Sequence, residues 1–250
     1  MRLILILTAL LAFQSAAASE FDEMKALADQ GMAAAQFNLG TMYDNGRGVP
    51  ENDAEAVKWY RKAADQGYAD AQYNLGVYYK HGVSMPENDA EAVKWFRKAA
   101  EQGLAVAQYN LGLMYASGEG VPENDAEAVK WVRKSVDQGA PYAQHQLGWM
   151  YENGEGVPKN DIEAFNWYAR AAAQGNERAQ YNLGLMYATG SGVLKSKIRA
   201  YVWWSMSKIQ GTLRAESALD ILKPRMDAQQ IVQAQALATK CYESAYKECD

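Results

Sequence analysis

The stretch PENDAEAVKW occupies residues 50–59 and recurs without change at 86–95 and 122–131. The copies are 36 residues apart each time. Two other kinds of residue keep this spacing: the glycines Gly40, Gly76, Gly112, Gly148 and Gly184, and the tryptophans Trp59, Trp95, Trp131, Trp167 and Trp203. A fixed period of this length indicates a chain of stacked structural repeats, of which five are complete.

Each repeat has the pattern of two helices. Small and apolar residues recur at helical spacing in its first half, as at Ala35, Leu39 and Met42, and again in its second half around Trp59.

Asn52 followed by Glu55 is typical of a helix start, and the recurring Gly46 and Gly67 columns are typical of helix ends. Gly40 stands in mid-helix, where glycine costs about 1 kcal/mol, so we expect two helices to approach closely there.

A single helical pair cannot bury its apolar face, whereas stacked pairs share a continuous core, so the period predicts an all-α solenoid. We expect an N-terminal half-repeat helix at 19–31 and a C-terminal cap at 212–250, because Pro224 stops the last repeat-like helix. A final helix is expected from about Asp227 to Ser244. The five repeats between them are predicted at 32–67, 68–103, 104–139, 140–175 and 176–211.

Residues 1–18 have the pattern of a secretory signal peptide. Arg2 precedes an apolar stretch from Leu3 to Phe13, and small residues from Ala16 to Ala18 predict cleavage after Ala18. The eleven-residue apolar stretch is too short to cross a hydrocarbon core, which needs about 20 residues. We therefore expect an exported protein, periplasmic or secreted, with no membrane insertion after cleavage.

The composition excludes several classes of function. Lys and Arg total 25 against 30 Asp and Glu, a formal net charge of -5, so no nucleic-acid partner is expected. Only two His and two Cys are present, and no HExxH or paired CxxC motif accompanies them, so we expect neither a metal site nor a cofactor.

Residues 35–67, AQFNLGTMYDNGRGVPENDAEAVKWYRKAADQG, resemble a Sel1-like repeat, a relative of the tetratricopeptide repeat. The resemblance covers about 20–220 and implies a right-handed α-α superhelix whose first helices line a concave surface. Members of that family act as adaptors, so it also implies a protein or peptide partner. We expect a non-enzymatic monomer.

The resemblance also bears on the two cysteines. Exported cysteine-rich relatives carry a disulfide in each repeat, and these repeats have none, which sets the chain outside that subgroup. Cys241 and Cys249 have the spacing that such relatives bridge, so the resemblance and export together favour a disulfide. A straight helix would hold the two residues too far apart, so the bond requires a turn near Ser244. Free thiols or intermolecular pairing are the alternative.

By analogy with tetratricopeptide repeats, first-helix positions 34, 37, 41 and 44 and their equivalents face the concave groove. The fourth repeat differs most there, since His145 replaces an aromatic residue and Trp149 adds an indole. The alternative is that these aromatic residues pack between neighbouring first helices. The candidate partner-binding residues are Asp70, Tyr73, Tyr109, Tyr142, His145, Trp149, Glu152, Arg178 and Tyr181.

A β-lactam or peptidoglycan-directed envelope hydrolase is the alternative function, because some cysteine-rich relatives have been described as β-lactam binders or hydrolases. A serine mechanism of that kind needs Ser-x-x-Lys, which occurs at Ser205 to Lys208 and at Ser244 to Lys247. Neither Ser-Asp-Asn nor Lys-Thr-Gly is present, so we predict no catalytic residues.

Overall fold

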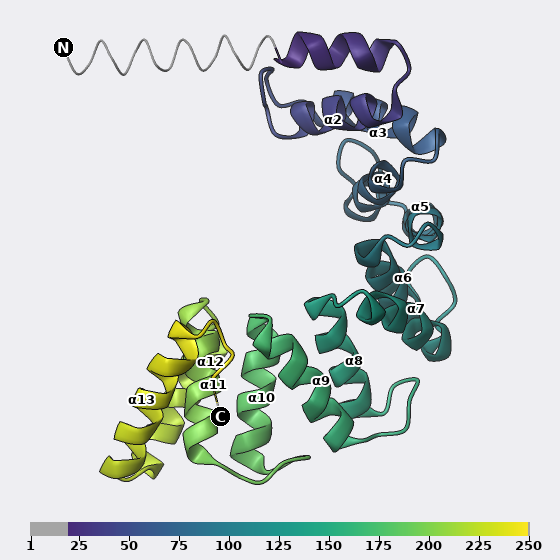
Figure 1. The fold of residues 1–250 in the computed structure, drawn as a ribbon. Coiled ribbons are helices and arrows are strands. Elements are labelled where there is room, and N and C mark those ends of the chain that lie inside the picture. The colour runs from purple at the N-terminus through teal and green to yellow at the C-terminus, as the bar shows by residue number, and fades with distance from the viewer. Residues whose placement is uncertain (1–19, 250) are drawn as a thin grey trace, which may run out of the picture. The chain divides into compact units, whose positions relative to one another are not determined.

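The computed structural model describes residues 20–249, so the predicted signal peptide lies outside the described residues. The described chain is helical, without strands, and forms an all-α solenoid (Figure 1). After a helix at 20–29 come the repeat helices in pairs: α2 (Ala33–Asp44) and α3 (Asp53–Asp65), α4 (Ala69–His81) and α5 (Asp89–Glu101), α6 (Ala105–Ser117) and α7 (Asp125–Asp137), α8 (Pro141–Asn153) and α9 (Asp161–Ala173), and α10 (Glu177–Thr189) and α11 (Lys197–Ile209).

The cap consists of α12 (Leu213–Leu222), a 3₁₀ turn at Lys223–Arg225 and α13 (Ala228–Glu243). The chain divides into two compact units, residues 1–123 and 124–250. In the first unit α2 packs on α3 and α4 on α5; in the second, α8 packs on α9, α10 on α11, and α11 on both α12 and α13. Among the described residues, no helix combines the length and the apolarity needed to cross a membrane.

The second helix of each repeat begins where the sequence predicts. The Asn52 side chain accepts a hydrogen bond from the backbone N–H of Glu55, at 3.1 Å, and Asn88, Asn124 and Asn160 cap their helices in the same way. In the fifth repeat Ser196 takes this role. The first helices of the second, third, fourth and fifth repeats end at a glycine in the left-handed conformation, Gly82 in α4 for example.

The mid-helix glycines mark close helix contacts, as the sequence predicts. A methyl group at Gly40 would lie 2.8 Å from Cδ1 of Tyr60 on α3, too close for any side chain. Gly76 meets Phe96, Gly148 meets Tyr168 and Gly184 meets Trp204 in the same way. Each contact joins the first helix to the second helix of the same repeat and lets the two backbones approach.

A buried glutamine joins successive repeats, a feature that the sequence analysis missed. The Gln72 side-chain amide donates to the carbonyl of Ala64 at the end of α3, at 3.1 Å, and its oxygen accepts from Gln102 at 2.7 Å. Gln36 and Gln180 make the equivalent pairs of bonds. Because a buried amide is costly unless it is hydrogen-bonded, these bonds hold the first helix of one repeat in register with the helix before it.

The C-terminal cap is closed by a disulfide between Cys241 and Cys249, whose Cα atoms are 4.4 Å apart. The chain turns directly after α13, where Ala245 and Tyr246 have positive φ angles. This turn brings the Tyr246 ring against the bend between α9 and α10, so that a methyl group on Gly175 would lie 3.1 Å from it. The short tail is therefore part of the packing of the second unit.

Candidate functional site

Two adjoining pockets open between the first helices of the second unit. The Trp149 pocket, of about 630 Å³, and the Trp204 pocket, of about 520 Å³, share Tyr181 and Arg214. We call them together the α8–α10–α12 groove. The Trp149 pocket is lined by His145, Trp149, Glu177, Arg178, Tyr181, Asn182, Thr212, Leu213 and Arg214. The Trp204 pocket is lined by Tyr181, Leu185, Ala188, Lys195, Lys197, Trp204, Arg214, Ser217, Ala218, Ile221, Leu222 and Arg225.

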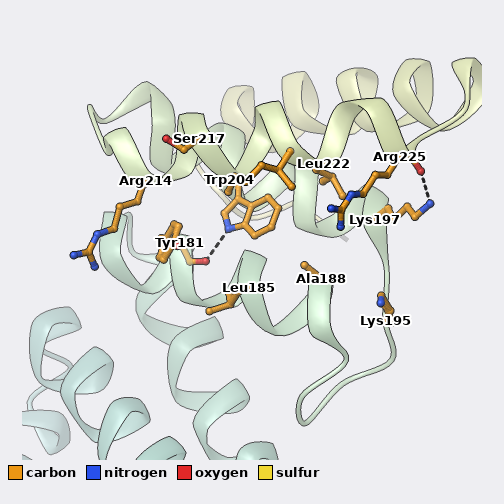
Figure 2. A pocket seen from close by; sticks show the side chains of 12 residues that line it. Tyr181, Leu185, Ala188, Lys195, Lys197, Trp204, Arg214, Ser217, Leu222 and Arg225 are labelled. Carbon is orange, nitrogen blue, oxygen red and sulfur yellow. Dashed lines mark hydrogen bonds between the residues drawn. The ribbon is translucent and has the colours of Figure 1, made fainter.

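The Trp204 pocket has an apolar floor with basic side chains around it. Figure 2 shows the Trp204 indole between α10 and α12, with Leu185 on the α10 side and Leu222 above. The indole Nε1 donates to the carbonyl of Tyr181 at 3.0 Å, which fixes the ring. Trp204 lines the pocket with only 6% of its surface exposed. Arg214 lies at one end of the floor, and the other basic side chains, Lys195, Lys197 and Arg225, lie at the opposite end (Figure 2).

The Trp149 pocket contains a neutral histidine. The His145 ring packs on Tyr168, with centroids 5.5 Å apart, and its Nε2 lies 3.2 Å from the amide nitrogen of Asn182. Burial, and to a smaller extent the nearby Arg178 guanidinium, lower the pKa of His145 to about 4 against the opposing effect of Glu177. His145 is therefore uncharged at neutral pH and acts here as an aromatic and hydrogen-bonding group.

The aromatic column at position 37 packs on the second helix of its own repeat. The ring centroid of Phe37 also lies 5.2 Å from that of Tyr68, the residue that precedes α4 of the next repeat, so the packing between neighbouring first helices is present in part. Ring centroids are 5.7 Å apart for Phe37 and Tyr60, 5.6 Å for Tyr73 and Phe96, and 6.5 Å for Tyr181 and Trp204. All the rings in the column are half-buried. They therefore contribute to the core with one part and remain accessible with the other.

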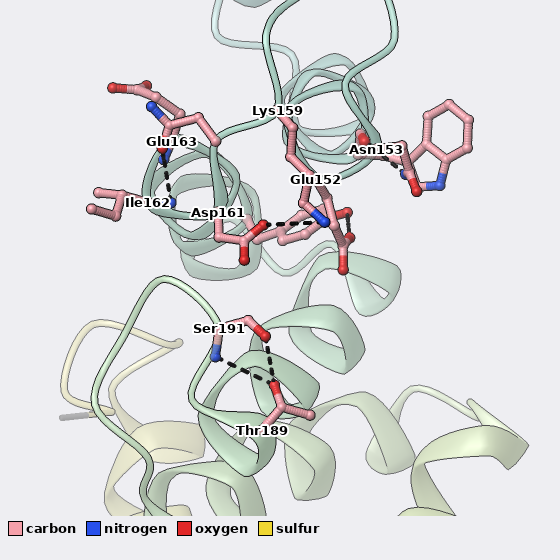
Figure 3. Close-up of polar contacts among 11 residues, drawn as sticks. Glu152, Asn153, Lys159, Asp161, Ile162, Glu163, Thr189 and Ser191 are labelled. Atoms are coloured by element: carbon pink, nitrogen blue, oxygen red, sulfur yellow. Dashed lines mark hydrogen bonds and ion pairs between the residues drawn. The ribbon is translucent and has the colours of Figure 1, made fainter.

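The acidic side chains at position 44 and its equivalents, Asp44 and Glu152, accept hydrogen bonds from tyrosines. Glu152 accepts a hydrogen bond of 2.6 Å from the Tyr168 hydroxyl, in the region drawn in Figure 3. In the first repeat Asp44 accepts from Tyr60 at 3.1 Å, and burial raises the pKa of Tyr60 to about 12. These carboxylates stabilise the contact between the two helices of a repeat.

The structure brings together four of the nine predicted partner-binding residues. His145, Trp149, Arg178 and Tyr181 line one pocket. Tyr142, half-buried in α8, and Glu152 line neither pocket of the groove. The remaining three, Asp70, Tyr73 and Tyr109, belong to the first unit.

The cap contributes residues to the groove that the repeat pattern did not predict. Position 34 corresponds to Arg214 in α12, position 37 to Ser217 and position 41 to Ile221, and all three line the Trp204 pocket. The sequence did indicate that α12 continues the repeats, because Ala215 and Leu219 keep the repeat spacing. In the structure both are buried like their equivalents. Trp204 was missed because it lies on a second helix.

The two Ser-x-x-Lys motifs are engaged in local contacts. The Ser205 hydroxyl donates to the carbonyl of Tyr201 at 2.7 Å, and Lys208 pairs with Glu216 at 2.7 Å. The Ser244 hydroxyl donates to the carbonyl of Cys241 at 3.0 Å. Among residues 20–249, no three or more His, Cys, Asp or Glu side chains are grouped as a metal site would require.

The Sel1 repeat family model matches residues 33–68, 69–104, 105–139, 141–176 and 177–211. The chain therefore belongs to the Sel1 repeat family, whose members generally mediate protein–protein interactions and whose fold is typically a non-catalytic scaffold. A comparison with curated proteins gives no match.

Solved structures similar to this chain include two that are more than 30% identical to it. A Sel1 repeat protein from Oxalobacter formigenes is 35% identical, with a TM-score of 0.76 over 82% of this chain and 86% of that chain. A protective antigen of uropathogenic Escherichia coli strains, which has the same repeat fold, is 32% identical, with a TM-score of 0.53 over 90% of this chain and 56% of that chain.

Proposed function

We propose that this chain is an exported binding protein that holds a protein or peptide partner in the α8–α10–α12 groove. The observation that carries the proposal is the exposed apolar surface in this groove. Leu185, Leu213 and Ile221 are 38%, 78% and 60% exposed. They come from α10 and α12; Leu185 and Ile221 line the Trp204 pocket, and Leu213 lines the Trp149 pocket. Large apolar side chains gathered in a concave surface are typical of interaction sites.

The groove also has the composition of a recognition surface. Trp149 and Tyr181 supply large, partly exposed aromatic surfaces, and Arg178 and Arg214 supply positive charge. Tryptophan, tyrosine and arginine dominate the energetics of protein interfaces. Trp204 and His145 are each held by a contact with the other helix of their own repeat, so little side-chain entropy would be lost at these rings when a partner binds.

The test of binding is cross-linking of the mature protein in the cell envelope, followed by mass spectrometry of the captured proteins. We compare the wild type with Trp149→Ala and with Leu185→Asp, each shown to be folded by circular dichroism. Leu194→Asp is the matched control, because Leu194 is 88% exposed but does not line the groove. A partner lost by both groove variants and kept by the control supports the proposal; equal capture by all four proteins refutes it.

Export to the periplasm or beyond is the second part of the proposal, and it rests on the residue pattern of 1–18. N-terminal sequencing of the protein recovered outside the cytoplasm is expected to begin at Ser19. A chain lacking residues 2–18 is expected to remain in the cytoplasm. Recovery of the full-length chain from the cytoplasm alone would refute export without affecting the binding proposal.

A further inference from the structure

We propose that the Trp204 pocket binds an extended segment of the partner in which apolar residues lie between two acidic residues. This inference rests on the proposed function of the groove and specifies the chemistry of the segment. It follows from three properties of the pocket: basic side chains that form no ion pair with a carboxylate, the separation of these side chains, and the volume between them.

The basic side chains of the pocket lack acidic partners. None of the twelve residues that line the pocket is acidic. Within residues 20–249, no carboxylate forms an ion pair with Lys195, Lys197, Arg214 or Arg225. Glu216, on the same helix as Arg214, pairs with Lys208 instead. Four cations around an apolar floor, in a chain of net charge -5, favour an anionic and partly apolar ligand.

The charges lie at two ends of the floor, which defines a length. Arg214 is near the start of α12, and Arg225 follows its end beside Lys195 and Lys197 (Figure 2). Eleven residues of helical chain separate the two arginines by roughly 16 Å, at about 1.5 Å per residue. A fatty acid carries a single anionic end and would leave one end of the pocket uncompensated. Two carboxylates joined by an apolar segment match both ends.

The volume favours an extended segment over a helix. A helix roughly 16 Å long and about 10 Å in diameter occupies on the order of 1,300 Å³, more than twice the 520 Å³ of the pocket. An extended chain advances about 3.3 Å per residue, so about five residue steps cover the same length. Alternate side chains of such a strand point to one side, where the Trp204 indole and Leu185 form the floor.

The direct test uses labelled hexapeptides and fluorescence anisotropy with the full mature protein. The probe is Asp-Leu-Ala-Leu-Ala-Asp, and the matched peptides carry Lys at both ends or Asn in place of one Asp. We expect the two-acid peptide to bind best, the one-acid peptide about fivefold more weakly, and the lysine peptide not at all. The fivefold figure corresponds to an exposed ion pair of about 1 kcal/mol.

Substitutions in the protein, rather than in the peptide, test the same contacts. Arg214→Ala and Arg225→Ala are each expected to weaken the two-acid peptide about fivefold, and Lys247→Ala, an exposed lysine outside the pocket, is expected to leave binding unchanged. Equal binding of the acidic and lysine peptides overturns the inference. So does the absence of binding up to about 1 mM, or tighter binding of decanoate than of the peptide.

The outcomes separate this inference from the proposed function. If the partner captured in the envelope is lost with Leu185→Asp but kept at wild-type level by the Arg214→Ala, Arg225→Ala double variant, the acidic segment is refuted and the groove remains the binding site. If Leu185→Asp retains the partner, the proposed function of the groove itself fails.

Discussion

The backbone of Gly148 in α8 lies directly against the ring of Tyr168 in α9: a methyl group at Gly148 would stand 2.8 Å from the Cδ1 atom of Tyr168. The same tyrosine stacks on His145 and donates its hydroxyl proton to Glu152. Three residues of one face of α8 are therefore positioned by one side chain of α9. Since His145 lines the Trp149 pocket, the shape of that pocket depends on this contact.

Gly148→Ala is expected to destabilise the protein by about 1 to 3 kcal/mol, because overpacking against Tyr168 outweighs the gain of about 1 kcal/mol in helix propensity. Urea unfolding followed by circular dichroism measures the change. In a Tyr168→Val background, which removes the ring, the same substitution is expected to be neutral or stabilising. An equal loss in both backgrounds would show that the ring is not the cause.

The depressed pKa of His145 predicts a loss of stability in mild acid. The folded protein holds this side chain neutral down to about pH 4, whereas the unfolded chain takes up a proton near pH 6.5. The contribution of neutral His145 to the free energy of unfolding is therefore complete above pH 6.5. It declines as the pH falls from there toward 4, because the unfolded chain then binds a proton that the folded protein does not. Between pH 7.5 and pH 5 the free energy of unfolding should fall by about 2 kcal/mol from this group.

His145→Gln isolates that contribution, because it removes the titrating ring and leaves the carboxylates of the chain unchanged. Unfolding curves at the two pH values are compared for the wild type and the variant. The variant should lose about 2 kcal/mol less than the wild type over this range. Identical pH dependence of the two proteins would mean that burial does not hold His145 neutral.

Asn160→Ala is expected to cost about 1 kcal/mol, because the Asn160 side-chain oxygen accepts from the backbone N–H groups of Ile162 and Glu163, both at 3.1 Å. Asn160→Asp retains an acceptor at the start of α9 and is expected to change stability little. Thermal unfolding of the three proteins measures the difference. A loss as large with Asp as with Ala would contradict a capping role.

Loss of the Cys241–Cys249 bond is expected to destabilise the C-terminal cap. A loop of this size corresponds to about 2.5 kcal/mol in the chain-entropy model of disulfides. Part of that loss should be local, since the bond holds Tyr246 on the bend near Gly175. Hydrogen exchange of α13 should therefore rise with dithiothreitol. The Cys241→Ser, Cys249→Ser variant, which has no bond to reduce, should show fast exchange with or without the reductant.

The helical pairs and their boundaries could be predicted because local chemistry decides them. Asn52 and its equivalents cap a helix through bonds to residues three positions away, and a glycine such as Gly82 ends one through its own backbone conformation. The close approach at Gly148 was also predictable, since glycine in mid-helix is costly unless a neighbour requires it. The identity of that neighbour, Tyr168, was not, because it lies on another helix.

The repeat period by itself determined the class of fold, the helices and their ends, because these depend on residues close together in the chain. Only the tertiary structure decided which side chains remain accessible. The position 37 column, including Tyr181, is half covered by rings of the second helix, and Arg214 and Ile221 of the cap complete a groove that the repeats alone do not form. Accessibility is set by atoms brought near from distant parts of the chain, and no spacing within one helix encodes it.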